Sequence, residues 1–366
     1  MADREFDDAQ LGWDQGRPQR FNLAVLGATG VGKSTLVNAV FGEDVARTGI
    51  GEPVTKGVNF YLNKAQTLGL YDSEGAESFA DLESFVDNFK KIYDERLRQD
   101  PTSAIHGVWF CVRAGDRRFD DRQATVVRRL ADMGLPVMLV VTQTPWRPGY
   151  GIAPDAKALL DHIHSLRLPI VGGRPIPVSA LDDDFHGTSR FGLDHLLKVT
   201  FDAAPVGVRT AFASAQRIDA HMKSGEAKKV VAKAVAVTAG IAATPIPVAD
   251  APILVAAQFG MLRQLSGIYG VEVPATALAG ALAGGGATLA GRSIVSGLLK
   301  FVPVAGLVIN AGVAGGLTWV LGQAWSELCE RHWLGRINLD AASRAGQLAP
   351  LLNETLRQWA TRRPKE

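Results

Sequence analysis

The chain has 366 residues, which is enough for two domains with a hydrophobic core each. Its formal net charge is +2, so the overall charge gives no indication of a nucleic-acid partner. Only two cysteines occur, Cys111 and Cys329, which excludes a disulfide framework and indicates a reducing, cytoplasmic environment.

Residues 1–20 are charged and polar, without the apolar core of a signal peptide. Alanine stands at position 2, where N-myristoylation requires glycine. We therefore expect a mobile N-terminal arm ahead of the first domain.

A phosphate-binding sequence, GATGVGKST, follows the apolar run 21–26 and has the spacing of a P-loop between a strand and a helix. Its glycines let backbone N–H groups converge on phosphate oxygens, while Lys33 supplies a positive charge and Ser34 a hydroxyl ligand for Mg²⁺. An ordinary glycine-rich turn is the alternative. We expect nucleotide contacts from Gly27, Thr29, Gly30, Val31, Gly32, Lys33, Ser34 and Thr35.

Strand-like and helix-like runs alternate over 21–205, which predicts an α/β domain with a mostly parallel sheet and helices on both faces. We expect the ligand site at the carboxyl ends of the strands. The expected strands are 22–26, 58–64, 66–71, 105–113, 136–142 and 175–178. The expected helices are 33–41, 77–98, 120–133, 154–165 and 191–201.

Glycine and proline in GEPVTKG, residues 51–57, predict a loop between the first helix and the second strand. Thr55 in this loop is placed to ligate Mg²⁺ and to offer a backbone N–H to the γ-phosphate, which would make the loop sense the nucleotide state and assist catalysis. A loop threonine without such a role is the alternative.

The sequence DSEG, residues 72–75, ends the apolar strand 66–71. Asp72 is placed to hold the hydration shell of Mg²⁺, and Gly75 to bring its N–H against the γ-phosphate. A common surface turn is the alternative.

The sequence PVSAL, residues 177–181, follows the last expected strand. With GATGVGKST, PVT and DSEG it completes, in order, four of the five motifs of Era-like and TrmE-like GTPases, and residues 20–205 resemble that branch. The resemblance implies GTP and GDP as ligands, Mg²⁺ as cofactor, and base contacts from Ser179, Ala180 and Leu181. It also implies that two copies can pair across their nucleotide faces.

The base-reading motif of that family, Asn/Thr-Lys-x-Asp, is replaced here by TQTP. Thr142 and Gln143 are expected at the base, but Pro145 lacks the carboxylate that accepts hydrogen bonds from guanine, a loss of about 1–3 kcal/mol. Guanine preference therefore rests on the resemblance, and a purine-promiscuous or ATP-using enzyme is an alternative.

Ala76 follows DSEG where Ras-like proteins carry a water-orienting glutamine, which predicts slow hydrolysis unless a partner or second protomer supplies the missing group. Glu74 or Glu77 is the alternative within the chain. A further set of arginines either reaches a phosphate across a dimer or forms a solvated loop, and comprises Arg113, Arg117 and Arg118.

A charge-poor stretch rich in alanine and glycine, residues 234–326, marks a second domain. We divide this part of the chain into a linker over 206–226, an apolar helical-hairpin domain over 227–330, and an amphipathic C-terminal helix with its tail over 331–366. The expected hairpins pair 227–243 with 251–266 and 275–299 with 307–328.

The uncharged run 301–326 is long enough to span a bilayer, although it contains Pro303 and Asn310. We favour association with membrane lipid at the inner face of a membrane, helped by the basic residues of 223–233, over a soluble four-helix bundle.

The Gly/Ala-rich hairpins with PIPVAD and PVAG, joined to such a GTPase domain, resemble bacterial GTPases with a YcjF-type domain of unknown function. A more distant resemblance is to immunity-related GTPases. Together these features predict a GTP-hydrolysing switch that couples its nucleotide state to a membrane or protein partner. A nucleotide-gated scaffold and a membrane-disturbing effector are the alternatives.

Overall fold

The structure is a computed structural model, and it describes residues 20–42, 52–55, 58–73, 79–183, 188–243, 250–286 and 309–361. The chain forms two compact units that meet in sequence between Asp219 and Ala220. This boundary falls inside the segment 206–226, which the sequence marks as a linker. Much of that segment is helical.

The first unit is built on a seven-stranded sheet in the order β2-β3-β4-β1-β5-β6-β9. Strands β4, β1, β5, β6 and β9 run parallel, and β3 is antiparallel to both β2 and β4. The strands are β1 (Phe21–Leu26), β2 (Glu52–Thr55), β3 (Val58–Leu62), β4 (Leu68–Ser73), β5 (Gly107–Arg113), β6 (Val137–Thr142) and β9 (Ile176–Pro177). The expected α/β fold with a mostly parallel sheet is confirmed.

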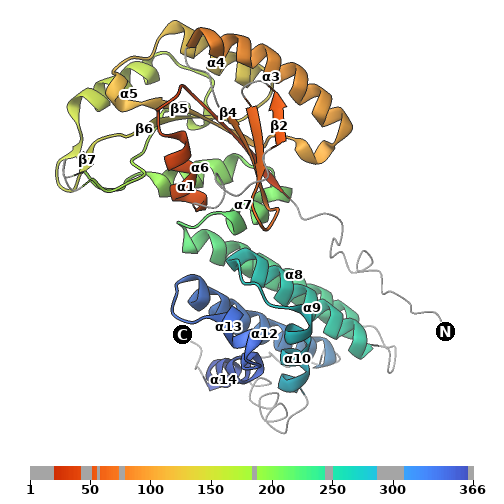
Figure 1. The fold of residues 1–366 in the computed structure, drawn as a ribbon. Helices are drawn as coiled ribbons and strands as arrows, with labels where there is room; N and C mark the ends of the chain where they lie inside the picture. The colour runs from red at the N-terminus through yellow and green to blue at the C-terminus, as the bar shows by residue number, and fades with distance from the viewer. Residues whose placement is uncertain are drawn as a thin grey trace. The chain divides into compact units, whose positions relative to one another are not determined.

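Helices cover both faces of this sheet, with α3, α4 and α5 on one side and α1, α6 and α7 on the other (Figure 1). The helices are α1 (Lys33–Phe41), α3 (Phe79–Gln99), α4 (Asp121–Asp132), α5 (Pro154–Ser165), α6 (Leu193–Ala203) and α7 (Arg209–Ala215). Short 3₁₀ turns are η2 (Pro101–Ser103), η3 (Ala114–Asp116), η4 (Val171–Gly173) and η5 (Val206–Val208).

Strand β5 shows why the sheet is buried on both sides. Its residues Val108 and Phe110 point into the core beneath α3, α4 and α5. Trp109, between them, points to the other face and stacks on Phe41 of α1 with ring centroids 5.7 Å apart. A strand covered on both faces reads as a continuous apolar run, which is why the sequence located it.

The expected loop over 51–57 is wrong in part, because residues 52–55 form the edge strand β2. Pro53 is compatible with this strand because an edge position leaves one side of the backbone without a ladder partner. A second element that the sequence did not indicate is the hairpin of β7 (Trp146–Arg147) and β8 (Gly151–Ile152). Its two-residue strands are too short to show a period.

The second unit is helical. Its core gathers side chains from several helices, including Val231, Met261, Trp325 and Leu352. The Trp325 indole N–H lies 3.1 Å from the Leu262 carbonyl oxygen, which satisfies its buried polar atom. The helices are α8 (Ala220–Ala243), α9 (Asp250–Tyr269), α10 (Ala275–Gly286), α12 (Ile309–Trp333), α13 (Leu339–Arg344) and α14 (Leu348–Thr361).

The structure corrects the expected position of the basic residues near the first hairpin. Helix α8 begins at Ala220, not at 227, so they lie within the helix. Lys223 is buried and its ammonium donates to the Ile268 carbonyl oxygen at 2.6 Å, which makes it part of the core and not a contact for lipid headgroups. Across the described ranges, no helix has the length and apolarity needed to cross a membrane.

Candidate nucleotide-binding site

The turn between β1 and α1 has the backbone conformation of a phosphate cradle. Gly27, Gly30 and Gly32 have φ angles of 146°, 80° and 92°, a region that side chains disfavour. A Cβ on Gly27 would lie 2.4 Å from the Cys111 carbonyl oxygen of the neighbouring strand. The turn therefore requires glycine for its conformation and, at Gly27, for the close approach of β5.

The N-terminus of α1 opens onto this cradle without a side-chain cap. Its N-cap residue is Gly32, and the first turn contains no acidic residue. The first N–H groups of a helix have no partners within the helix and favour an anion. The Lys33 ammonium lies back across the loop and donates to the carbonyl oxygens of Gly27 at 2.9 Å and Ala28 at 3.1 Å. Positive charge and orphan N–H groups therefore converge here.

Asp72 lies near the carboxyl end of β4, where it is paired with Val25 of β1 and Asn59 of β3. Burial raises the pKa of the Cys111 thiol to about 12, while the Lys33 charge lowers this pKa and the Asp72 charge raises it. Both charges therefore act at one place on this edge of the sheet. The Asp72 carboxylate and the hydroxyl of the exposed Ser34 are hard oxygen donors of the kind that suits Mg²⁺.

Two predicted residues are not brought to this cradle by the described structure. Thr55 is the last residue of β2, opposite Val58 of β3, and its side chain lies outside the described residues. Gly75 also lies outside them, as does the rest of 74–78, including the expected water-positioning residues. Their roles stay predictions.

A cavity of about 1090 Å³ extends from Gly32 and Thr35 to the turn after β9. The single hydroxyl proton of Thr142, at the end of β6, faces two carbonyl oxygens, that of Val31 in the phosphate loop and that of Val112 at 3.0 Å. Gln143 has a φ of 51° and its amide lies 3.4 Å from the Gly30 carbonyl oxygen. The two residues predicted at the base thus connect β6 to the phosphate loop.

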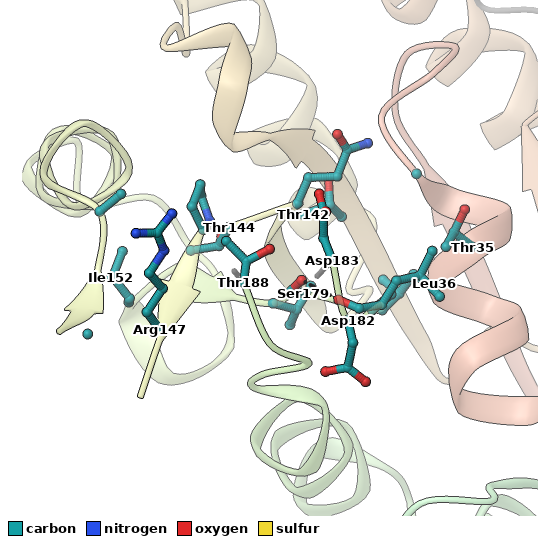
Figure 2. A pocket seen from close by; sticks show the side chains of 18 of the residues that line it. Thr35, Leu36, Thr142, Thr144, Arg147, Ile152, Ser179, Asp182, Asp183 and Thr188 are labelled. Carbon is teal, nitrogen blue, oxygen red and sulfur yellow. Dashed lines mark hydrogen bonds between the residues drawn. The ribbon is translucent and has the colours of Figure 1, made fainter. Parts of the chain in front are cut away.

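Ser179, which Figure 2 labels, lines the same cavity together with Ala180 and Leu181. Ser179 and Phe191 exchange two backbone hydrogen bonds of 2.9 and 3.0 Å, and the Ser179 hydroxyl donates to the Leu181 carbonyl oxygen at 3.1 Å. The structure therefore brings the two stretches predicted at the base, 142–143 and 179–181, to one cavity.

Sequence reasoning missed further residues that line this cavity, and those with long or charged polar side chains are Arg147, Tyr150, Asp182 and Asp183. The first two lie in and beside the β7–β8 hairpin, and the acids in the turn after Leu181. The sequence RPGYG, which is rich in turn-forming residues, was the available signal for the hairpin.

Two of the three predicted arginines, Arg113 at the end of β5 and Arg117 in the segment after it, form ion pairs within their own chain. Arg113 contacts Asp116 at 2.5 Å, and Arg117 contacts Asp155 at 2.7 Å. All four side chains are exposed, as in the solvated-loop alternative.

A mostly parallel sheet whose first strand leads through a glycine-rich turn into an uncapped helix defines a P-loop nucleotide-binding protein. Comparison with family models narrows this class. Residues 22–143 match the family described as 50S ribosome-binding GTPase, and residues 210–344 match a domain of unknown function, DUF697. The chain thus carries a P-loop GTPase domain followed by a DUF697 domain.

Among curated proteins, GTPase Era of Neisseria meningitidis is 30% identical over 125 residues, which covers 33% of this chain and 37% of Era. GTP-binding protein A of Dictyostelium discoideum is 33% identical over 118 residues, covering 30% of this chain and 24% of that protein. The chain therefore spans well under half the length of these relatives.

Among solved structures, the translation elongation factor SelB of Methanococcus maripaludis in its apo form aligns at 14% identity, with a TM-score of 0.29. The alignment covers 52% of this chain and 35% of that one, and a likeness this weak supports no inference. The Era-like resemblance is shown at low identity, and the likeness to immunity-related GTPases stays a prediction.

Proposed function

We propose that the protein is a Mg²⁺-dependent GTPase switch that binds GTP, hydrolyses it to GDP and phosphate, and uses the nucleotide state to control how its helical unit meets a membrane or protein partner. The observation that carries this proposal is the cradle of Gly27, Gly30 and Gly32 at the uncapped start of α1, with the Lys33 ammonium lying across it.

Each residue of the cradle has a defined task in this proposal. When phosphates enter, the ammonium of Lys33 exchanges its bonds with the loop carbonyl oxygens for bonds with phosphate oxygens. The backbone N–H groups of the loop and helix hold the same oxygens. During in-line attack by water, these fixed donors stabilise the charge that develops on the γ-phosphate.

Ser34 and Asp72 are the described residues that would hold Mg²⁺, with Thr55 as a third ligand. The ion, when bound, neutralises negative charge on the β- and γ-phosphates. Thr55 and the Gly75 N–H are proposed to order around the γ-phosphate and thereby to distinguish GTP from GDP.

The alternative that a specific observation favours is a nucleotide-gated scaffold with little hydrolysis. Ala76 has no group that orients water, and Arg113 and Arg117 are paired within the chain. A single-turnover assay separates the two functions, since a scaffold leaves bound GTP intact over hours.

Replacing Lys33 by Ala tests the site. We expect at least a tenfold loss of GTP and GDP affinity, from the loss of charge-assisted hydrogen bonds, and loss of measurable turnover. Isothermal titration and phosphate release measure the two effects. The control is Lys198→Ala, which removes an exposed lysine of α6 that pairs with Asp202. Wild-type hydrolysis by Lys33→Ala would refute the proposal.

A further inference from the structure

We infer that Asp183 supplies the carboxylate that recognises the guanine base, in place of the family acid at the position where this chain has Pro145. The inference rests on the proposed GTP binding and goes beyond it by naming the group that selects the base. The cavity lacks the expected acid at position 145 but is lined by two acids from the turn after Leu181, Asp182 and Asp183.

Position 145 has a different task in this fold. The Pro145 carbonyl oxygen accepts a hydrogen bond of 3.0 Å from the Ala153 N–H, which closes the base of the β7–β8 hairpin. Its side chain has no acceptor atom. The chain after β6 therefore lines the cavity, but the Pro145 side chain cannot accept hydrogen bonds from the N–H groups of guanine.

The hairpin is joined to the turn that carries the acids. The Trp146 carbonyl oxygen accepts from the Ser189 N–H at 3.1 Å, and the Trp146 ring stacks on Phe191 with centroids 5.1 Å apart and planes 9° apart. Asp183 and Thr188 exchange two backbone hydrogen bonds of 2.8 and 3.0 Å. These contacts hold Asp183 at the cavity that the TQTP stretch also lines.

Burial and the direction of the side chain distinguish the two acids. Asp182 is exposed, and one oxygen of its carboxylate accepts from the Arg190 backbone N–H at 2.8 Å. Asp183 is half-buried. Figure 2 shows the Asp183 side chain on the side of Thr142 and the Asp182 carboxylate directed away from it. Asp183 is therefore the acid placed to meet a base in the cavity.

The chemistry of guanine matches a carboxylate at this place. The ring N1–H and the 2-amino group both donate along one edge, and the two oxygens of one carboxylate can accept both bonds. Partial burial reduces competition from water, which strengthens such bonds. Adenine has an acceptor at N1 and no 2-amino group, so the same carboxylate would disfavour it.

Titration calorimetry of the full-length protein with four diphosphates tests the assignment: GDP, IDP, XDP and ADP. Wild type should prefer GDP over IDP by about tenfold or more, because IDP lacks the 2-amino group. Asp183→Asn should lose this preference and gain affinity for XDP relative to GDP, since an amide N–H can donate to the C2 carbonyl of xanthine. Asp182→Asn should keep the wild-type order.

A gain of function gives an independent test. Adding Pro145→Asp to Asp183→Asn should restore the preference for GDP over IDP, because an acid returns to the family position. In the wild-type background Pro145→Asp should change that preference by less than about threefold, since Asp183 already meets the same donors. A tenfold gain in that background would overturn the inference even if Asp183→Asn did not fold.

The outcomes also separate this inference from the proposed function. If wild type binds GDP, Lys33→Ala does not, and Asp183→Asn keeps the wild-type ratio of GDP to IDP affinity, the inference is wrong and GTP binding stands. Transfer of the loss to Asp182→Asn would likewise overturn the assignment to Asp183. If none of the nucleotides binds to wild type, both proposals fail.

Discussion

At the scale of single residues, one glycine limits the geometry of the turn that leads into α6, beside the 178–181 stretch that lines the cavity. Gly192 has a φ of 75°, and a Cβ there would lie 2.2 Å from the Pro177 carbonyl oxygen of β9. Because the obstructing atom belongs to the backbone, it cannot rotate away. Gly134 has nearly the same φ, 77°, but open space around it. Substitutions at these two glycines therefore separate the cost of an unfavourable φ angle from the cost of a steric clash.

We predict that Gly134→Ala lowers the free energy of unfolding by about 1 kcal/mol, the cost of a side chain in the left-handed region. Gly192→Ala should cost about 1–3 kcal/mol more, since β9 or the Ser179–Phe191 pairing must shift. It should also weaken GDP binding, whereas Gly134→Ala should not. Urea denaturation and calorimetry measure both effects, and equal destabilisation by the two variants would contradict the steric argument.

At the scale of elements, small residues decide how closely α12 packs on its neighbours in the helical unit. A Cβ on Gly322 would lie 2.7 Å from a methyl carbon of Val231 in α8 and 3.0 Å from the sulfur of Met261 in α9. A Cβ on Gly315 of the same helix would make ordinary contacts at 3.5 Å with Val235 and Ala239. Gly322 therefore limits how closely α12 approaches α8 and α9, whereas Gly315 does not.

Gly322→Ala should destabilise the helical unit by about 1–3 kcal/mol through overpacking. Gly315→Ala should leave it unchanged or stabilise it by up to about 1 kcal/mol, because alanine favours a helix over glycine. Hydrogen exchange of the amides of α8, α9 and α12, measured across a urea series, reports this unit apart from the first one. Stabilisation by Gly322→Ala would show that the helices do not approach as closely as described.

At the scale of the whole molecule, the question is whether the nucleotide changes the helical unit. Each unit has its own buried core, so it has the means to be stable by itself. Under the proposed switch, GTP and GDP stabilise different arrangements of the loops near Thr55 and Gly75, and this difference must reach α8–α14 to have an effect there.

Hydrogen exchange of the full-length protein should therefore show protection in 220–361 that differs between a non-hydrolysable GTP analogue and GDP. The difference should disappear in Lys33→Ala and persist in Lys198→Ala. Flotation with anionic vesicles in both nucleotide states tests whether the binding of the protein to lipid depends on the same nucleotide change. Identical protection of the helical unit in both states would contradict coupling and leave the nucleotide acting on the GTPase unit alone.

The sequence by itself determined the buried strands of the sheet and the phosphate cradle. The buried strands β1, β5 and β6 are continuous apolar runs, and the residues from Gly27 to Thr35 are consecutive, so local spacing carries their geometry. It also located α1 and α5 with their observed bounds, because glycine or proline marks where each begins.

Only the tertiary structure decided the base site and the environment of several charges. Pro145 and Asp183 are far apart in sequence and line one cavity because of the hairpin and the turn, whose short paired segments leave no periodic pattern. Lys223 belongs to a basic sequence typical of a surface, yet the contacts of α8 with the end of α9 bury it. The physical reason is the same in both cases: such contacts join residues distant in the chain, and no local preference specifies them.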